Sequence, residues 1–137
     1  MKMTTIEVRT RSRTDFVDIT QQVQEIVGNT PFDSGIAVVF VPHTTAGVTI
    51  NENADPDVPR DLAYKINDLV PEGDPEYAHA EGNSDSHLKS SLFSPSLTLI
   101  FEKGRCVLGT WQALYLAEFD GPRTRKVHIK LIPADGD

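Results

Sequence analysis

Hydrophobic and polar positions along the first third of the chain follow two spacings. Residues 4–10 alternate as a half-buried strand does, because successive side chains of a strand point to opposite faces. The next apolar residues recur every three or four positions, which predicts a helix that opens with a capping box at Asp18 and stops at Gly28. Its apolar stripe is Ile19, Val23, Ile26 and Val27. Residues 36–41 are apolar on both faces, which predicts a central strand covered on each side.

The middle of the chain predicts a strand and then a second helix. From His43 to Asn51 the sequence has an apolar face and a polar face, and the polar one consists of His43, Thr45, Thr49 and Asn51. Such a polar face predicts the wall of a cleft. The next apolar stripe has helical spacing up to Pro71, with Asp55 as cap and Pro56 as first residue. Its members are Val58, Leu62, Ile66 and Leu69.

The last part of the chain is rich in predicted strands. Residues 72–86 are polar and predict an ordered loop, followed by a short helix over 87–92. Further strands are expected from Pro95, within 105–119 and over 126–132, separated by turns at Lys103-Gly104 and Asp120-Gly121-Pro122. This order predicts one α+β domain over residues 1–137, a small β-sandwich flanked by helices.

Composition narrows the kinds of protein that this chain can be. Twenty acidic and thirteen basic side chains give a formal net charge of −7, the wrong sign for binding nucleic acid through phosphate contacts. The longest aliphatic run is far shorter than the ~20 residues that span a bilayer, so we expect no membrane insertion. A single cysteine, Cys106, excludes an internal disulfide and fits a reducing compartment. We therefore expect a cytoplasmic protein.

The stretch HAEGNSDSH, residues 79–87, contains two of the four histidines. With His43 from the polar strand face, His79 and His87 would make an open three-histidine site for Zn²⁺ or a similar divalent ion. Asp85 or Glu81 would orient an imidazole or supply a fourth ligand. The alternative is a solvated polar loop in which Ser84 or Asp85 caps the following helix.

Two further clusters have both a structural and a functional interpretation. Within the segment 49–55, the five residues 51–55 carry four hydrogen-bonding side chains, which either satisfy the turn into the second helix or stand at the mouth of the cleft. Trp111 lies in a Gly-Thr-Trp-Gln segment and is either a packing residue or part of a ligand site. Arg123 and Arg125 are two residues apart in a predicted strand, so they face the same side. Their guanidinium groups could bind a phosphate by bidentate hydrogen bonds.

Four sequence blocks, in this order, resemble the YjbQ family over nearly the whole chain. They are HTTAGVTINENADP (43–56), HAEGNSDSHLKSS (79–91), GTWQ (109–112) and EFDGPR (118–123). The resemblance implies two mostly antiparallel sheets with helices outside, a homotrimer with its active site at or near a subunit boundary, and a secondary thiamine-phosphate synthase activity. It implies metal contact by His43, His79 and His87. It also implies a catalytic set of Asn51, Glu52, Asp85, Lys89 and Thr110, and substrate contacts by Asn53, Gln112 and Arg123.

The implied reaction joins hydroxymethylpyrimidine diphosphate to thiazole phosphate and releases diphosphate. The bond that breaks joins the methylene carbon of the pyrimidine to an oxygen of diphosphate. Its cleavage leaves negative charge on diphosphate, so we expect a divalent ion, Zn or Mg, to neutralise that charge. Lys89 and Arg123 are expected to contact the leaving group or substrate. Two alternatives stay open: a metal-dependent hydrolase of a small phosphorylated or carbonyl substrate, and a non-catalytic trimeric protein that binds a ligand.

Overall fold

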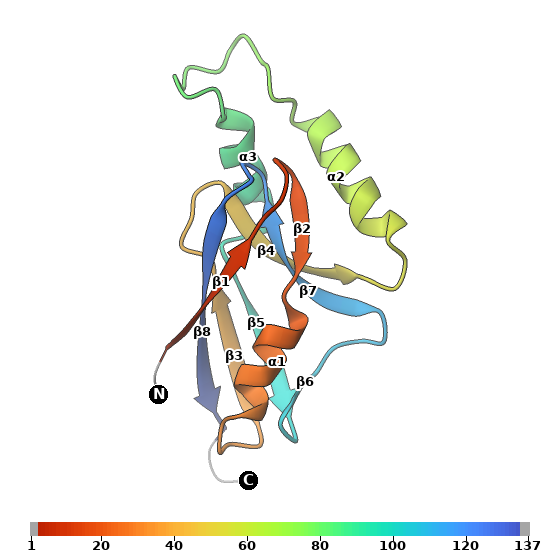
Figure 1. Ribbon diagram of the computed structural model, residues 1–137, viewed down its shortest axis with the longest axis vertical. Helices are drawn as coiled ribbons and strands as arrows, with labels where there is room; N and C mark the ends of the chain where they lie inside the picture. The colour runs from red at the N-terminus through yellow and green to blue at the C-terminus, as the bar shows by residue number, and fades with distance from the viewer. Residues whose placement is uncertain (1–2, 135–137) are drawn as a thin grey trace.

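The computed structural model describes residues 3–134, which form two antiparallel sheets and three helices (Figure 1). The larger sheet has the order β1 (Thr4–Arg9), β8 (Thr124–Pro133), β3 (Gly35–Phe40), β5 (Ser96–Glu102), β6 (Arg105–Cys106). The smaller sheet has the order β2 (Asp15–Asp18), β7 (Gln112–Glu118), β4 (Ala46–Glu52). Every strand pair is antiparallel. The predicted α+β sandwich is confirmed; strand β2 was not predicted.

The hydrophobic core lies between the two sheets. Alternate residues of the larger sheet, such as Ala37, Val39 and Phe101, are fully buried there, together with Leu114 and Leu116 of the smaller sheet. Successive side chains of a strand point to opposite faces, so every second residue of these strands reaches the core. Apolar burial of this kind is the main force that holds the two sheets together.

Helix α1 (Thr20–Gly28) closes one side of the core. Val23 and Val27 are fully buried, as its apolar stripe predicts. The predicted capping box is not formed, because Ile19 occupies the N-cap and no side chain caps the helix. Asp18 instead accepts hydrogen bonds from the backbone N–H and the hydroxyl of Thr20, at 2.9 and 2.6 Å.

Helix α3 (Ser84–Phe93) packs on the other face of the smaller sheet and begins three residues before the predicted position. A Cβ on Gly47 would lie 2.7 Å from the carbonyl oxygen of Ser94, so this glycine is required for strand β4 to lie this close to the end of helix α3. Phe16, Phe93 and Phe119 form an aromatic cluster beside it, with ring centres 5.0–6.3 Å apart. The smaller sheet is therefore covered on both faces.

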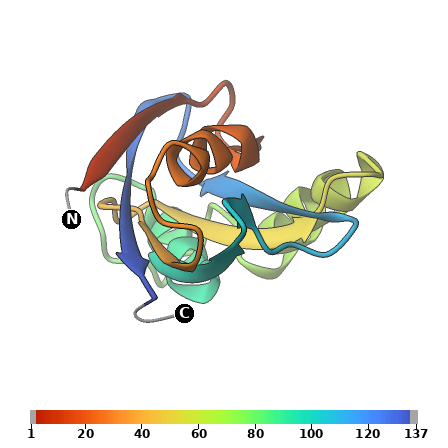
Figure 2. The same cartoon turned by 90° about the horizontal axis from the view of Figure 1, so that it is seen from below.

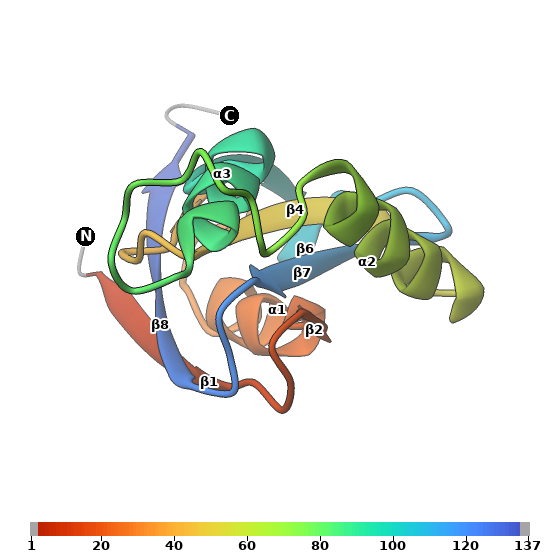
Figure 3. The same ribbon diagram turned by 90° about the horizontal axis from the view of Figure 1, so that it is seen from above.

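Two apolar surfaces of the single chain are left partly exposed. Helix α2 (Asp57–Leu69) lies at one edge of the molecule and has the predicted amphipathic stripe (Figures 2 and 3). None of its residues is fully buried: Val58, Leu62 and Ile66 are half-buried, and Leu69 is exposed. On the outer face of the larger sheet, Phe40, Ile100 and Ile132 are 43–54% exposed. The prediction that residues 36–41 are covered on both sides is therefore wrong within one chain. No helix in residues 3–134 has the length and apolar character needed to cross a bilayer.

Candidate functional site

A polar cavity of about 420 Å³ lies where three loops meet the start of β8. The loops join β3 to β4, α2 to α3, and β7 to β8, and Figure 3 shows the second of these passing over β8. His43, His79 and His87 all line the cavity, together with Arg123 and Arg125. Strand β4 begins only at Ala46, so His43 belongs to the loop before it and not to the strand as predicted. Tertiary structure thus brings three predicted blocks to one cavity.

His79 and His87 are placed as a pair. Their ring centres are 5.3 Å apart and their planes are nearly perpendicular, at 85°. With metal–nitrogen bonds of about 2.0–2.1 Å in tetrahedral geometry, two imidazole ring centres lie about 5.2 Å apart. This spacing fits two ligands of one zinc-like ion, and it is also the spacing of an ordinary edge-to-face ring contact.

His43 does not fit the role of a third ligand. Its Nε2 accepts a hydrogen bond from the backbone N–H of Lys126 at 2.9 Å, which leaves the proton of the neutral ring on Nδ1. A metal-bound imidazole normally donates a proton from its second nitrogen, the reverse of this bond. Burial and the charge of Arg125 lower the pKa of His43, which favours the neutral ring. Within residues 3–134 no three His, Cys, Asp or Glu side chains are grouped to hold a metal ion, so the predicted three-histidine group is not formed.

Arg125 forms a buried ion pair at the floor of the cavity. It is 4% exposed, and its guanidinium donates from Nε and Nη2 to the two carboxylate oxygens of Glu118, which is fully buried. Nη2 also donates to the hydroxyl of Thr45 at 2.8 Å. Burial would raise the pKa of Glu118, but hydrogen bonds from Arg125, the Asp120 amide and Thr10 lower it. Arg125 therefore supplies a positive charge at a fixed position, but its Nε and Nη2 groups are already hydrogen-bonded and do not form a bidentate contact with phosphate.

Arg123 and Asn83 meet at Asp120 on the rim. The Arg123 side chain is 52% exposed and donates to the carbonyl and carboxylate oxygens of Asp120 at 2.7 and 3.0 Å. Asn83 Nδ2 donates to the same carboxylate at 2.9 Å. The Asn83 side-chain oxygen is buried and accepts no hydrogen bond from any described residue. The sequence prediction included Arg123 but missed Asn83 and Asp120.

Asp85 and Lys89 are on the opposite side of α3 from the cavity. Asp85 is fully buried and Lys89 is 1% exposed, and they form an ion pair at 2.7 Å. Lys89 Nζ also donates to Asn67 Oδ1 at 2.7 Å. Lys89 is therefore not available for the predicted leaving-group contact, and Asp85 accepts from cations rather than from an imidazole. Hydrogen bonds from Arg13 and Lys89 outweigh the effect of burial and lower the pKa of Asp85 to about 2.

Arg13 is a residue of this region that the sequence prediction missed. Its guanidinium donates to both oxygens of Asp85 at 3.0 and 3.1 Å, and its carbonyl oxygen accepts from the Gly121 N–H. It thereby joins the β1–β2 turn, the histidine-bearing helix and the β7–β8 turn. No sequence pattern marks this contact, because the two partners are 72 residues apart.

The remaining predicted site residues lie at the other end of the smaller sheet. In the β4–β7 ladder Glu52 pairs with Gln112, whereas Ala46, next to the cavity, pairs with Glu118. Six positions along a strand cover roughly 20 Å. The far group consists of Asn51, Glu52, Asn53, Thr110 and Gln112. Within one chain, the structure does not bring this group to the histidines.

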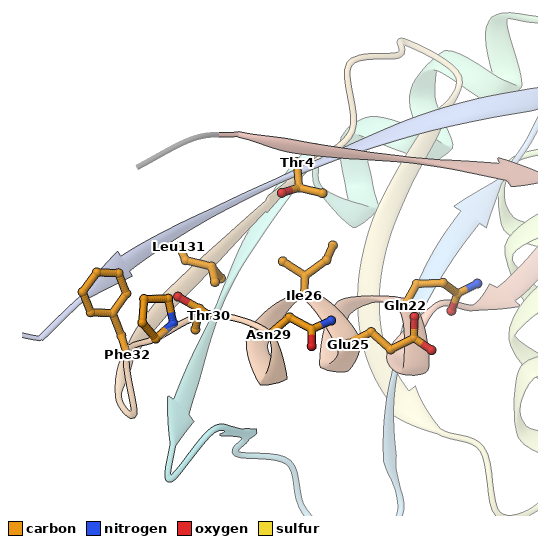
Figure 4. A pocket seen from close by; sticks show the side chains of 9 residues that line it. Thr4, Gln22, Glu25, Ile26, Asn29, Thr30, Phe32 and Leu131 are labelled. Carbon is orange, nitrogen blue, oxygen red and sulfur yellow. The ribbon is translucent and has the colours of Figure 1, made fainter.

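A larger cavity of about 680 Å³ lies between α1 and strands β1 and β8. Figure 4 shows Ile26 rising from α1 toward Thr4 across this space. Glu25 is the one ionisable side chain in its lining, and no predicted site residue reaches it. We therefore place the functional site at the smaller, charged cavity.

Known proteins resemble this chain over nearly its whole length. The profile described as UPF0047 protein YjbQ-like matches residues 4–134. UPF0047 protein YugU of Bacillus subtilis is 45% identical over 128 residues, which cover 93% of this chain and 97% of that protein. UPF0047 protein MJ1081 of Methanocaldococcus jannaschii is 47% identical over 126 residues, 92% of this chain and 91% of that protein.

Solved structures show the same fold. A YjbQ/UPF0047 protein of Clostridium acetobutylicum is 48% identical and superposes with a TM-score of 0.91, covering 94% of this chain and 99% of that one. A hypothetical protein of Aeropyrum pernix, 34% identical, has the same TM-score and covers 98% of this chain and all of that one. The chain belongs to the YjbQ-like UPF0047 family.

Proposed function

We propose that this protein transfers the pyrimidinylmethyl group of hydroxymethylpyrimidine diphosphate to the ring nitrogen of thiazole phosphate: the C–O bond to diphosphate breaks, a C–N bond forms, and thiamine phosphate and diphosphate are the products. The observation that carries the proposal is the single cavity that joins the His79–His87 pair to the guanidinium groups of Arg123 and Arg125. Both arginines already have a carboxylate partner, Asp120 for Arg123 and Glu118 for Arg125, and Arg123 is exposed enough to contact an anionic ligand as well. The cavity supports the reaction class, and the YjbQ resemblance supplies the two substrates.

The chain's own residues would bind and orient the diphosphate. Arg123 is exposed at the rim, where its fork can contact phosphate oxygens by charge-assisted hydrogen bonds. His43 carries a proton on Nδ1 and would donate it as a hydrogen bond, since its Nε2 already accepts one. Arg125 supplies a positive charge that its buried partners hold in place. Such preorganised groups stabilise the charge that develops on the leaving oxygen.

His79 and His87 would hold a divalent ion at the same cavity. When bound there, the ion would neutralise charge on the diphosphate leaving group. Imidazole ligands favour zinc and related transition metals, whereas magnesium prefers oxygen ligands. With two protein ligands instead of the expected three, more coordination positions stay open for substrate.

We propose that the protein acts as a homotrimer. The partly exposed apolar faces of α2 and of the larger sheet support a contact between copies, because exposed apolar surface of this kind is usually buried in assemblies. The group around Glu52, at the far end of β4, could reach the histidines only from a neighbouring copy. A head-to-tail contact of this kind closes into a three-membered ring when successive copies are related by a rotation of 120°. Light scattering should report three times the mass of one chain; a stable monomer would exclude the trimer.

Product analysis tests the proposed reaction. The purified protein is incubated with the pyrimidine diphosphate, thiazole phosphate and either Zn²⁺ or Mg²⁺, and the products are separated by chromatography. Thiamine phosphate formed by the protein and lost in Arg123→Ala supports the transferase. Hydrolysis of the diphosphate without coupling indicates a metal-dependent hydrolase, and binding without turnover indicates a ligand-binding protein; either result overturns the proposal.

A further inference from the structure

A second hollow, next to the polar cavity, lies between residues 76–79 of the α2–α3 loop and the first turns of helix α3. Its volume is about 480 Å³, and its lining includes Tyr77, Ala78 and Leu88. His79 and His87 line this hollow and the polar cavity alike. The two spaces therefore meet at the histidine pair. We call this second space the apolar hollow.

The exposure of Leu88 is not explained by the folding of one chain. Leu88 is 47% exposed on a helix whose inward side chains, such as Asp85 and Lys89, are polar. Tyr77 is half-buried, and its hydroxyl donates to the Pro71 carbonyl at 3.3 Å, which fixes the ring beside the hollow. An aromatic ring and an aliphatic side chain at the edge of a charged site are typical of a pocket for the apolar part of a ligand.

The contrast between the two spaces indicates a ligand with two ends. The polar cavity offers Arg123 and Arg125 beside two carboxylates, and the apolar hollow offers Tyr77 and Leu88 beside the single carboxylate of Glu76. Each volume lies within the range of small-molecule sites, roughly 300–1,000 Å³. We infer that the apolar hollow receives the aromatic ring of the phosphorylated substrate, so that Tyr77 and Leu88 select for a ring-bearing phosphate. The inference rests on the proposed function because it needs the anionic end of the substrate beside Arg123.

Binding at the two spaces can be distinguished with two phosphate ligands, one with an aromatic ring and one without. Phenyl phosphate carries a ring and inorganic phosphate does not, and both can be titrated calorimetrically into the intact protein. The unmodified protein should bind phenyl phosphate at least tenfold more tightly than inorganic phosphate. Leu88→Ser and Tyr77→Ala should reduce that ratio to about threefold or less while leaving the affinity for inorganic phosphate unchanged.

Leu92→Ser is the matched control. Leu92 is 67% exposed one turn further along α3, and it does not line the apolar hollow, so its replacement should keep the tenfold ratio. Arg123→Ala should weaken both probes by a similar factor. An unchanged ratio in both Leu88→Ser and Tyr77→Ala, or equal affinities in the unmodified protein, overturns the inference but not the anionic site. If neither probe binds, the proposed function fails and the inference fails with it.

Discussion

The polar side chains on the two faces of helix α3 differ in burial and in hydrogen bonding. On the inner face, Asp85 and Lys89 are at most 1% exposed, and both are hydrogen-bonded to charged or amide partners. On the outer face, His87 is half-buried and lines open cavities. A buried charge is tolerated only when it is paired, so the inner face serves the fold. Polar atoms that face a cavity are accessible to a ligand, so we assign the outer face to function. Unfolding measurements can test this division.

The largest expected effect comes from removing Asp85. Asp85→Ala leaves the buried Lys89 ammonium without its carboxylate, and losing one partner of a buried pair costs about 3–5 kcal/mol. Urea unfolding followed by circular dichroism measures the change in the free energy of unfolding.

The double variant Asp85→Ala, Lys89→Met is the control for that experiment. It removes both charges together, so it should be more stable than Asp85→Ala alone, because no buried charge is left unpaired. A double variant that is less stable than the single one would show that the pair is not what makes Asp85 important.

Acid should remove a smaller amount of stability through the same carboxylate. The pKa of Asp85 is about 2, below its ordinary value of 3.8, so this group stabilises the fold above about pH 4 and loses that contribution as the pH falls toward 2. The difference corresponds to about 2 kcal/mol. The carboxyl carbon chemical shift of Asp85, measured by NMR, should stay at its ionised value down to pH 3. Titration with a midpoint near 4 would contradict the proposed hydrogen bonds from Arg13 and Lys89.

Arg13→Lys should have a smaller effect again, about 1 kcal/mol, because it keeps the charge but loses the two-pronged contact with Asp85. The Arg13 side chain is 33% exposed, so solvent screens part of the interaction. Thermal unfolding gives the stability. Arg11→Lys is the control, since Arg11 makes no side-chain contact with α3 among the described residues, and it should change nothing measurable.

The smallest effect on stability is expected from His87→Ala. His87 makes no hydrogen bond through its ring to the described part of the chain, so the free energy of unfolding should change by less than about 0.5 kcal/mol. Bound zinc, measured by elemental analysis of protein purified without a histidine tag, should fall by most of its original amount. His128→Ala is the control, because His128 is on β8 outside the cavity. Retention of full zinc content in His87→Ala would exclude the His79–His87 pair as the metal site.

Part of the candidate site was predictable because it follows from local sequence. The loops that hold His43, His79 and Arg123 each follow or precede a strongly patterned strand or helix, and the three residues do line one cavity. The roles of Asp85 and Lys89 were not predictable in the same way. They fall in the same block as His87, but each is two residues away from it along α3, which is about half a turn and places them on the opposite side of the helix.

The sequence by itself determined the two antiparallel sheets, the apolar stripes of α1 and α2, and the family, because these depend on periodicity and on local blocks of residues. Only the tertiary structure decided which polar groups are paired. The bond from the Lys126 amide to His43 and the contact of Arg13 with Asp85 join segments 83 and 72 residues apart. The direction of a hydrogen bond and the burial of a charge depend on neighbours in space, and no spacing along the chain records them.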